Sequence, residues 1–278
     1  APPISPIVLP SGHLFVATDS MTDRTVDEYA LQGGSLVAQR LRDPLRNSLT
    51  IDAAIDISDT QVFHVVATGG YKIEYASITS TTSTYTPLAS LSYTKVTALA
   101  AQRQGTMVAV AGQGGGTQPM AYSVPQGAPS MINGTPMVKN VIGLGMGELN
   151  GDERIDLVAL YDDKSLGVFL GNATPSGYEL NFNTASSQAL SQAAGLTQSA
   201  AMSTADLDRD GLEDVLLGEG NQVRVLYSQG DGTFTSHVLV MSGTTSGMGV
   251  GSLAAGDLSS DGKPDLIVGT IVFMVVLR

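Results

Sequence analysis

The sequence predicts an all-β chain built from repeated units of about fifty residues, and two observations support this fold class. Short runs rich in Val, Ile, Leu and Tyr alternate with Gly, Ser, Thr, Asn and Asp along the chain, as is typical of strands joined by turns. One acidic nonapeptide also occurs three times in the second half, each time directly before an apolar run. No stretch has a helical periodicity long enough to build a helical layer, so strands are expected throughout.

The three acidic copies share one pattern and one spacing. They read ELNGDERID at residues 148–156, DLDRDGLED at 206–214 and DLSSDGKPD at 257–265. Equivalent aspartates lie 58 and 51 residues apart, measured from Asp152 to Asp210 and from Asp210 to Asp261. A repeat of this period indicates one supersecondary module for each copy.

Each copy carries oxygen donors at positions 1, 3, 5 and 9 and a free carbonyl at position 7, a set that can converge on one hard cation. Calcium takes about six to eight oxygen ligands at about 2.3–2.6 Å. We therefore expect three calcium ions. The predicted ligands are Glu148, Asn150, Asp152, Arg154 (carbonyl) and Asp156; Asp206, Asp208, Asp210, Leu212 (carbonyl) and Asp214; and Asp257, Ser259, Asp261, Lys263 (carbonyl) and Asp265.

Charge supports a bound cation. The three copies hold 12 of the 26 acidic residues and only three basic ones, and crowded carboxylates repel one another unless they are neutralised. An ordinary Asp/Gly turn between strands remains the alternative for any single copy. Three copies in the same place before a strand favour the cation.

Glycine placement distinguishes the first copy from the others. Gly211 and Gly262 stand at position 6, where a positive φ lets the chain double back. The first copy has Glu153 there and carries Gly151 two places earlier, so its turn is the least defined by the sequence.

The spacing also separates these copies from other calcium motifs. An EF-hand needs a Glu at position 12 and flanking helices, whereas position 12 here is Ala159, Leu217 or Val268. The pattern, with a downstream turn GDGTF at residues 230–234, resembles the FG-GAP or VCBS repeat over residues 141–278. That resemblance implies a β-propeller like those of integrin α chains and some fungal and bacterial lectins. Its blades have four antiparallel strands, with calcium in the loop between the first two.

The front half carries the same apolar cores without the acidic loops. LFVAT, HVVATGG and VAVAG begin at residues 14, 64 and 108, so six units fit. We expect one six-bladed propeller domain over residues 1–278, with about 23 strands against 24 for six complete blades. The stretch 4–9 can be the inner strand of the first blade or the outer strand of the last. The predicted units are 1–46, 47–93, 94–138, 139–196, 197–245 and 246–278.

The calcium loops are expected in the last three blades only. In the second unit the corresponding set is Asp56, Ser58, Thr60 and His64, which contains a single carboxylate. The third unit shortens the segment to residues 101–105 and the first to residues 10–12. We therefore expect no metal in the first three units.

Composition excludes several classes of function. A net charge of −12 and a pI near 4.4 argue against nucleic acid and anionic membranes as partners, and no run approaches the roughly 18–20 apolar residues of a membrane span. The chain has no cysteine, and its histidines (His13, His64 and His237) lie in or beside predicted strands. No catalytic motif is present, so we expect no enzyme activity and no catalytic residue.

The predicted function is a calcium-stabilised extracellular binding or adhesion module that recognises a protein or surface ligand through propeller loops. A lectin with sugar sites between blades is the alternative, although the chain has no Trp and only 5% aromatic residues. An accessory domain of a larger secreted protein is a further alternative. The chain opens with Ala1, Pro2 and Pro3 and no initiator Met, so we expect either the mature product of signal removal or an excised domain. Weak calcium sites fill at extracellular concentrations, so secretion or surface display is expected.

Overall fold

The computed structural model describes the strands of the whole chain and some of the loops of its second half. Side chains are described mainly in residues 96–100, 109–112, 140–171, 201–218, 222–239 and 250–269. The described backbone comprises residues 7–8, 13–19, 24–32, 35–45, 50–58, 61–68, 72–77, 86–90, 95–101, 107–113, 119–123, 129–130, 140–171, 183–189, 201–220, 222–240, 250–270 and 274–277.

The first half of the chain forms three antiparallel sheets of four strands each, in which consecutive strands are neighbours. Their bounds are β1 (Ile7–Val8), β2 (His13–Asp19), β3 (Arg24–Gln32) and β4 (Ser35–Leu45); β5 (Thr50–Ser58), β6 (Gln61–Thr68), β7 (Lys72–Ser77) and β8 (Thr86–Ser90); and β9 (Lys95–Ala101), β10 (Met107–Gln113), β11 (Met120–Ser123) and β12 (Pro129–Ser130).

The second half forms two further four-stranded sheets and one sheet with three described strands, again in chain order. All pairs are antiparallel, as in β14 with β13 and β15. The bounds are β13 (Val141–Gly147), β14 (Asp156–Tyr161), β15 (Ser165–Leu170) and β16 (Asn183–Ala189); β17 (Met202–Ala205), β18 (Asp214–Glu219), β19 (Gln222–Ser228) and β20 (Phe234–Val240); and β21 (Val250–Gly256), β22 (Asp265–Thr270) and β23 (Met274–Leu277).

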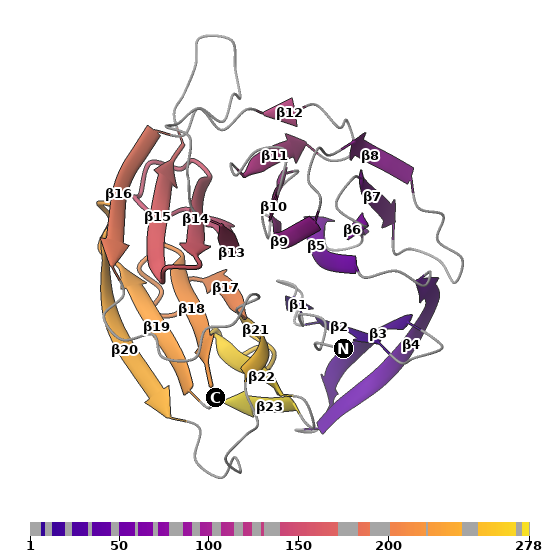
Figure 1. Cartoon of the computed structure of the whole chain (residues 1–278). Coiled ribbons are helices and arrows are strands. Elements are labelled where there is room, and N and C mark those ends of the chain that lie inside the picture. Colours follow the sequence, from indigo (N-terminus) through magenta and orange to yellow (C-terminus); the bar gives the residue numbers. More distant parts are fainter. Residues whose placement is uncertain are drawn as a thin grey trace.

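The sheets surround a common centre (Figure 1), with the first strand of each sheet innermost and the last strand at the rim. Neighbouring inner strands touch around the ring, from β5 to β9, β13, β17 and β21, and β21 also contacts β1. The last sheet therefore lies beside the first. The all-β prediction is confirmed. The two alternatives for stretch 4–9 are also resolved, because β1 pairs with β2 as the inner strand of the first sheet.

In the second half of the chain the described core lies between neighbouring sheets, because the central strands β14, β18 and β22 bury both of their faces. In β14, Leu157 and Ala159 pack toward the sheet that begins with β9, whereas Val158 and Leu160 pack toward the sheet that begins with β17. All four side chains are fully buried. Burying a Leu or Val side chain contributes about 1.5–3 kcal/mol, so each sheet is stabilised by its neighbours.

Glycines in β13 allow this close stacking. A Cβ on Gly145 would lie 2.5 Å from Cγ2 of Thr204, which belongs to the next sheet. The hydroxyl of Thr204 donates a 2.8 Å hydrogen bond to the carbonyl of Met146, so the two inner strands are also joined by a buried polar contact. The glycine cluster at residues 143–147 thus serves packing. Among the described residues, no helix has the length and apolarity needed to cross a bilayer.

Candidate metal sites

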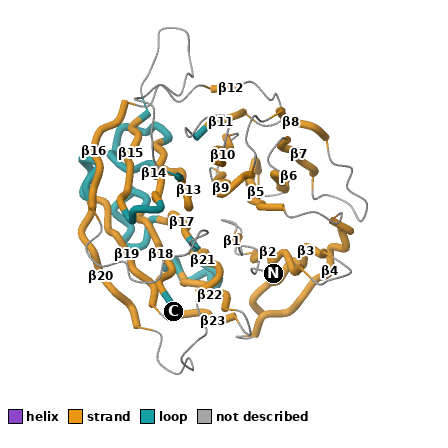
Figure 2. Tube along the Cα trace, in the orientation of Figure 1, coloured by secondary structure: helices purple, strands orange, loops and turns teal. Residues whose placement is uncertain are grey.

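The three acidic segments occupy the same place in their sheets, the loop between the first two strands (Figure 2). We call them loop 1 (residues 148–156), loop 2 (206–214) and loop 3 (257–265). Each is preceded by an inner strand and runs into a buried strand, respectively β14, β18 and β22. Their last residue is the first residue of that strand.

All three loops have a left-handed backbone conformation at the same two positions. Positive φ angles occur at positions 4 and 6 of each loop: 80° at Gly151 and 61° at Glu153; 66° at Arg209 and 90° at Gly211; and 58° at Ser260 and 77° at Gly262. Loop 1 therefore does not depart from the others as its sequence suggested. The loop places its glycine at position 4 and a Glu at position 6, and residues other than glycine are disfavoured at such angles.

The position-1 carboxylate of each loop accepts hydrogen bonds from N–H groups of the same loop. Oε1 of Glu148 accepts hydrogen bonds from the N–H groups of Asn150 (3.0 Å), Gly151 (2.7 Å) and Asp152 (3.3 Å). In loop 2 both oxygens of Asp206 accept loop N–H groups, those of Arg209 and Gly211. Asp257 of loop 3 does the same for Asp261 and Gly262. These bonds draw the loop around its acidic side chains.

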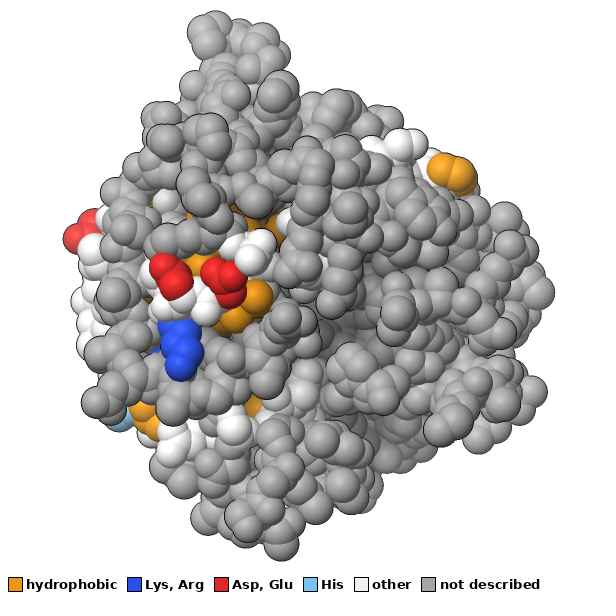
Figure 3. Space-filling view, viewed as in Figure 1, with side chains coloured by type: hydrophobic (Ala, Val, Ile, Leu, Met, Phe, Trp, Pro, Cys, Tyr) orange, Lys and Arg blue, Asp and Glu red, His pale blue; other side chains and the backbone are white. Residues whose placement is uncertain are grey.

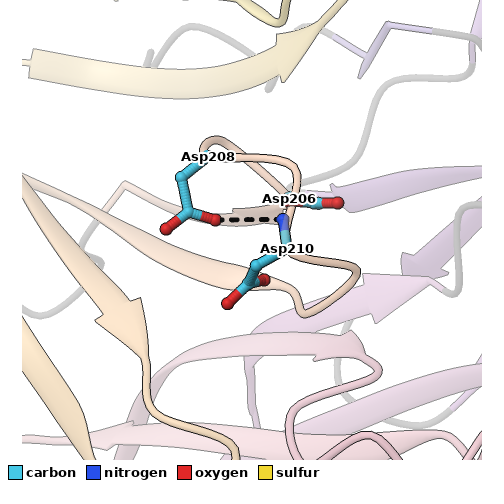
Figure 4. Close-up of side chains that lie close together, drawn as sticks. All are labelled: Asp206, Asp208 and Asp210. Carbon is cyan, nitrogen blue, oxygen red and sulfur yellow. Dashed lines mark hydrogen bonds between the residues drawn. The ribbon is translucent and has the colours of Figure 1, made fainter.

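Loop 2 brings three carboxylates together. Ligand oxygens of Asp206, Asp208 and Asp210 all lie within 4.8 Å of one another (Figure 4). One oxygen of Asp208 accepts the N–H of Asp210 at 3.2 Å, and one oxygen of Asp210 accepts the N–H of Leu212 at 2.8 Å. The second oxygen of each accepts no hydrogen bond from the described residues. At such distances like charges repel by about 1 kcal/mol per pair even in water.

The position-9 aspartates lie apart from this group, beneath the loops. Asp156 and Asp214 are almost wholly buried, and each bridges its own loop to the end of the third strand. Asp156 accepts the N–H groups of Leu149 (2.8 Å) and Gly171 (2.7 Å). Asp214 accepts those of Leu207 (3.0 Å) and Ser228 (2.9 Å). In loop 3, Asp265 accepts two loop N–H groups, from Leu258 and Ser259.

Burial raises the pKa of two of these carboxyl groups. The pKa of Asp156 rises to about 7, because desolvation outweighs its two backbone hydrogen bonds and the charges of Glu148 and Asp152 add to the rise. The pKa of Asp214 rises to about 6, again chiefly through desolvation, with smaller contributions from Asp208 and Asp210. A nearby cation would favour the ionised form of both groups.

The remaining predicted ligands are the carbonyls of the three position-7 residues, whose backbone contacts are alike and whose side-chain contacts differ. The three position-7 residues are held by their N–H groups, which donate to the position-5 Asp of the same loop. Their role as carbonyl ligands remains a prediction. In loop 1 the guanidinium of Arg154 also forms an ion pair with Asp152 at 3.2 Å. In loop 3 the hydrogen bond from Lys263 lowers the pKa of Asp261, with smaller help from the charges of Lys263 and Arg209.

The residues present fit a hard divalent cation. Loop 2 supplies three clustered carboxylates, and two of them keep an oxygen without a hydrogen bond from the described chain. In loop 1, Oε2 of Glu148 is buried and has no hydrogen-bond partner among the described residues. Oxygen-only donor sets of this kind suit calcium. Loops 1 and 3 offer fewer carboxylates, because Asn150 and Ser259 replace an Asp at position 3.

The sequence pattern did not predict the contacts between loop 1 and the sheet β17–β20. The N–H of Glu213 in loop 2 donates to the carbonyl of Glu148 in loop 1 at 2.6 Å. The hydroxyl of Ser228, at the end of β19, donates to the carbonyl of Leu149 at 2.8 Å. The partners lie more than sixty residues apart in sequence, so no local pattern could have found them.

On the face drawn in Figure 3, described acidic side chains lie next to Lys or Arg side chains over the sheets β13–β16 and β17–β20. Within loop 1, the ion pair of Arg154 with Asp152 offsets part of the local negative charge.

Comparison with known proteins agrees with the fold and the loops. Residues 149–217 and 206–268 match the FG-GAP-like repeat family. The second half of the chain therefore carries FG-GAP-like repeats, which confirms the resemblance predicted from the acidic copies. No match is found among curated proteins.

Solved structures extend the likeness to the whole chain. One is BBS1N in complex with ARL6DN, soaked with mercury: it is 15% identical, the match covers 96% of this chain and 74% of that chain, and the TM-score is 0.55. The same complex soaked with lead is 13% identical, with coverage of 99% and 92% and a TM-score of 0.54. At this identity the likeness shows the fold alone, a β-propeller.

Proposed function

We propose that this chain is a calcium-stabilised, six-bladed β-propeller that binds a protein partner through its loops. The observation that carries the proposal is the common geometry of the three loops, which share positive φ angles at positions 4 and 6 and a position-1 carboxylate that accepts loop N–H groups. In this proposal each of the six sheets is one blade, and each of the last three blades holds one calcium ion.

Calcium has a structural task in this proposal. In loop 2 three carboxylates lie within 4.8 Å of one another at the start of a buried strand. A divalent ion would remove their mutual repulsion and favour the ionised form of Asp214 beneath them. The ion would hold the loop and perform no chemistry, and the chain would have no enzymatic activity of its own.

A protein partner is supported by fold and composition. Propellers present variable loops on a rigid ring, and one structural neighbour, BBS1N, is recorded in complex with the protein ARL6DN. The low aromatic content of the chain gives little material for stacking on sugars. An extracellular setting is part of the proposal, because weak oxygen-ligand sites fill at millimolar calcium.

The test is a binding screen of the immobilised chain against extracellular proteins and a glycan array, in calcium and in chelator. We expect a protein ligand that binds in calcium and is released by chelator. Asp210→Ala should weaken this binding. The matched control, Asp163→Ala, removes an exposed carboxylate from the β14–β15 turn, at the other end of β14 from loop 1, and should leave binding unchanged. Protein binding that is equal in calcium and chelator would contradict the proposal, and glycan binding blocked by a monosaccharide would replace it with a lectin.

A further inference from the structure

The backbone of loop 1 accepts two hydrogen bonds from the neighbouring sheet, one from loop 2 and one from the end of β19. Glu213, at position 8 of loop 2, donates its N–H to the carbonyl of Glu148 at 2.6 Å. Ser228 donates its hydroxyl to the carbonyl of Leu149 at 2.8 Å, and this bond is buried. The sheet that carries loop 2 therefore holds the first two carbonyls of loop 1.

Side-chain packing strengthens the junction. The Glu213 side chain lies against the backbone of Gly147, where a Cβ would come within 2.2 Å of its Cγ. Leu212 approaches Gly151, with its Cδ2 3.8 Å from where a Cβ of that glycine would stand. Positions 8 and 7 of loop 2 thus pack, respectively, on the residue just before loop 1 and on position 4 of loop 1.

The residues that hold loop 1 are also part of the framework of loop 2. Leu212 is positioned by Asp210, because its N–H donates a 2.8 Å hydrogen bond to the Asp210 carboxylate. Ser228 donates its own N–H to Asp214, at position 9 of loop 2, at 2.9 Å. A cation that orders Asp210 and Asp214 would therefore order the groups that touch loop 1.

Among the described residues, the junction between loops 2 and 3 lacks the N–H donor that Glu213 supplies between loops 1 and 2. Position 8 of loop 3 is Pro264, which has no N–H and so cannot make the bond that Glu213 makes. The charges of Arg209 in loop 2 and Asp261 in loop 3 attract one another across this junction. Both side chains are exposed, and attraction between exposed charges is weak and screened by salt.

We propose that loops 1 and 2 bind their cations as a coupled pair, whereas loop 3 binds its cation independently. This inference rests on the proposed calcium sites. Coupling between two sites is reciprocal, so each cation should raise the affinity of the other loop by the same factor.

The test is a calcium titration of the full chain, followed by hydrogen exchange and mass spectrometry so that each loop gives its own midpoint. Asp208→Asn with Asp210→Asn removes the loop 2 site. We expect the loop 1 midpoint to move to at least about fivefold higher calcium, the lower end of ordinary coupling, with loop 3 moving by less than about twofold. Asp152→Asn should shift loop 2 by a similar factor.

Two further variants isolate the junction. Glu213→Pro copies the natural Pro264 and removes the N–H, and Ser228→Ala removes the hydroxyl with little risk to folding. Either change alone should reduce the shift that the loop 2 double variant causes in loop 1, and the two changes together should abolish it, whereas Glu213→Gln, which keeps the N–H, should preserve the shift. A loop 1 midpoint that ignores the loop 2 variant, or a loop 3 shift of equal size, would overturn the coupling. Absence of calcium-dependent protection in every loop of the native chain would overturn the proposed function itself, and the coupling with it.

Discussion

The three sheets of the first half and the three of the second half share one strand order but join their first two strands differently. In the second half a nine-residue acidic loop, which includes the first residue of the second strand, makes this connection. In the sheet β5–β8, only residues 59–60 separate β5 from β6. Asp56 lies in β5 paired with Val62, and His64 lies in β6 paired with Ala54. Three members of the set that resembled a metal loop in sequence, Asp56, Ser58 and His64, thus lie in paired strands.

The difference teaches that the fold does not require a cation at this connection. A two-residue connection lets the strands pair up to Ser58 and Gln61, and the ladder itself satisfies the backbone groups. A nine-residue loop leaves many N–H groups without strand partners. In loops 1–3 carboxylates accept those N–H groups, and the acids that do so then repel one another. Calcium dependence should therefore be confined to the second half.

The largest expected effect is that of calcium on overall stability. Each site filled at about a hundredfold excess over its Kd contributes about 2.7 kcal/mol. Chelator should therefore lower the Tm of the native chain by at least about 5 °C, measured by differential scanning calorimetry. Superimposable melting curves with and without chelator would remove the distinction between the two halves.

The next effect is the loss of one site. Asp210→Ala should remove about a third of the Tm increment that calcium gives, and in chelator it should cost little because it relieves repulsion with Asp206 and Asp208. Asp56→Ala in β5 is the control from the first half and should leave the calcium increment at its native size. An equal loss in both variants would contradict the assignment of calcium to the second half.

A smaller effect is expected from pH in the absence of calcium. Burial raises the pKa of Asp156 to about 7 and of Asp214 to about 6, above the value of about 4 in the unfolded chain. Their contribution to stability is therefore complete below about pH 4 and is lost as the pH rises through 6 to 7. In chelator, the Tm should increase as the pH falls from 7 toward 4. A Tm that falls steadily over this range would show that these two carboxylates are not buried as described.

The smallest effects concern the turns themselves. Glu153→Gly should stabilise loop 1 by about 0.5–1 kcal/mol, because φ is 61° at that residue. Gly211→Ala should destabilise loop 2 by about 1 kcal/mol through backbone strain alone, since a Cβ there would meet no atom within 4 Å. Urea unfolding in saturating calcium measures both. If both substitutions were neutral, loops 1 and 2 would not share one backbone path.

Much of the fold could be predicted from the sequence because its signals are local. Alternating apolar runs identified the strands, and the repeated nonapeptide identified three connections of one kind. The backbone of loop 1 was harder to predict, because Glu153 at position 6 gave no sign of the positive φ that it shares with position 6 of the other two loops. The sequence reports the preference of a single residue, whereas its φ in the folded chain also depends on the hydrogen bonds that the rest of the loop makes.

The sequence predicted which residues form the candidate site, but not which of them cluster at the loop and which are buried beneath it. Spacing placed Asp206, Asp208 and Asp210 together, and the structure does so too. It could not distinguish the exposed Asp208 and Asp210 and the half-buried Asp206 from the buried Asp214, because that difference depends on the end of β19 packing beneath the loop. The contacts of Glu213 and Ser228 with loop 1 were likewise invisible, since they join different sheets.

The most direct test of calcium binding in the second half is a crystal structure of the chain grown in calcium, with anomalous scattering used to locate the ions. We predict three peaks, one in each of loops 1, 2 and 3, and none at the connections of residues 9–12, 59–60 and 102–106. Loops without peaks at saturating calcium, or peaks at the connections of the first half, would contradict the account.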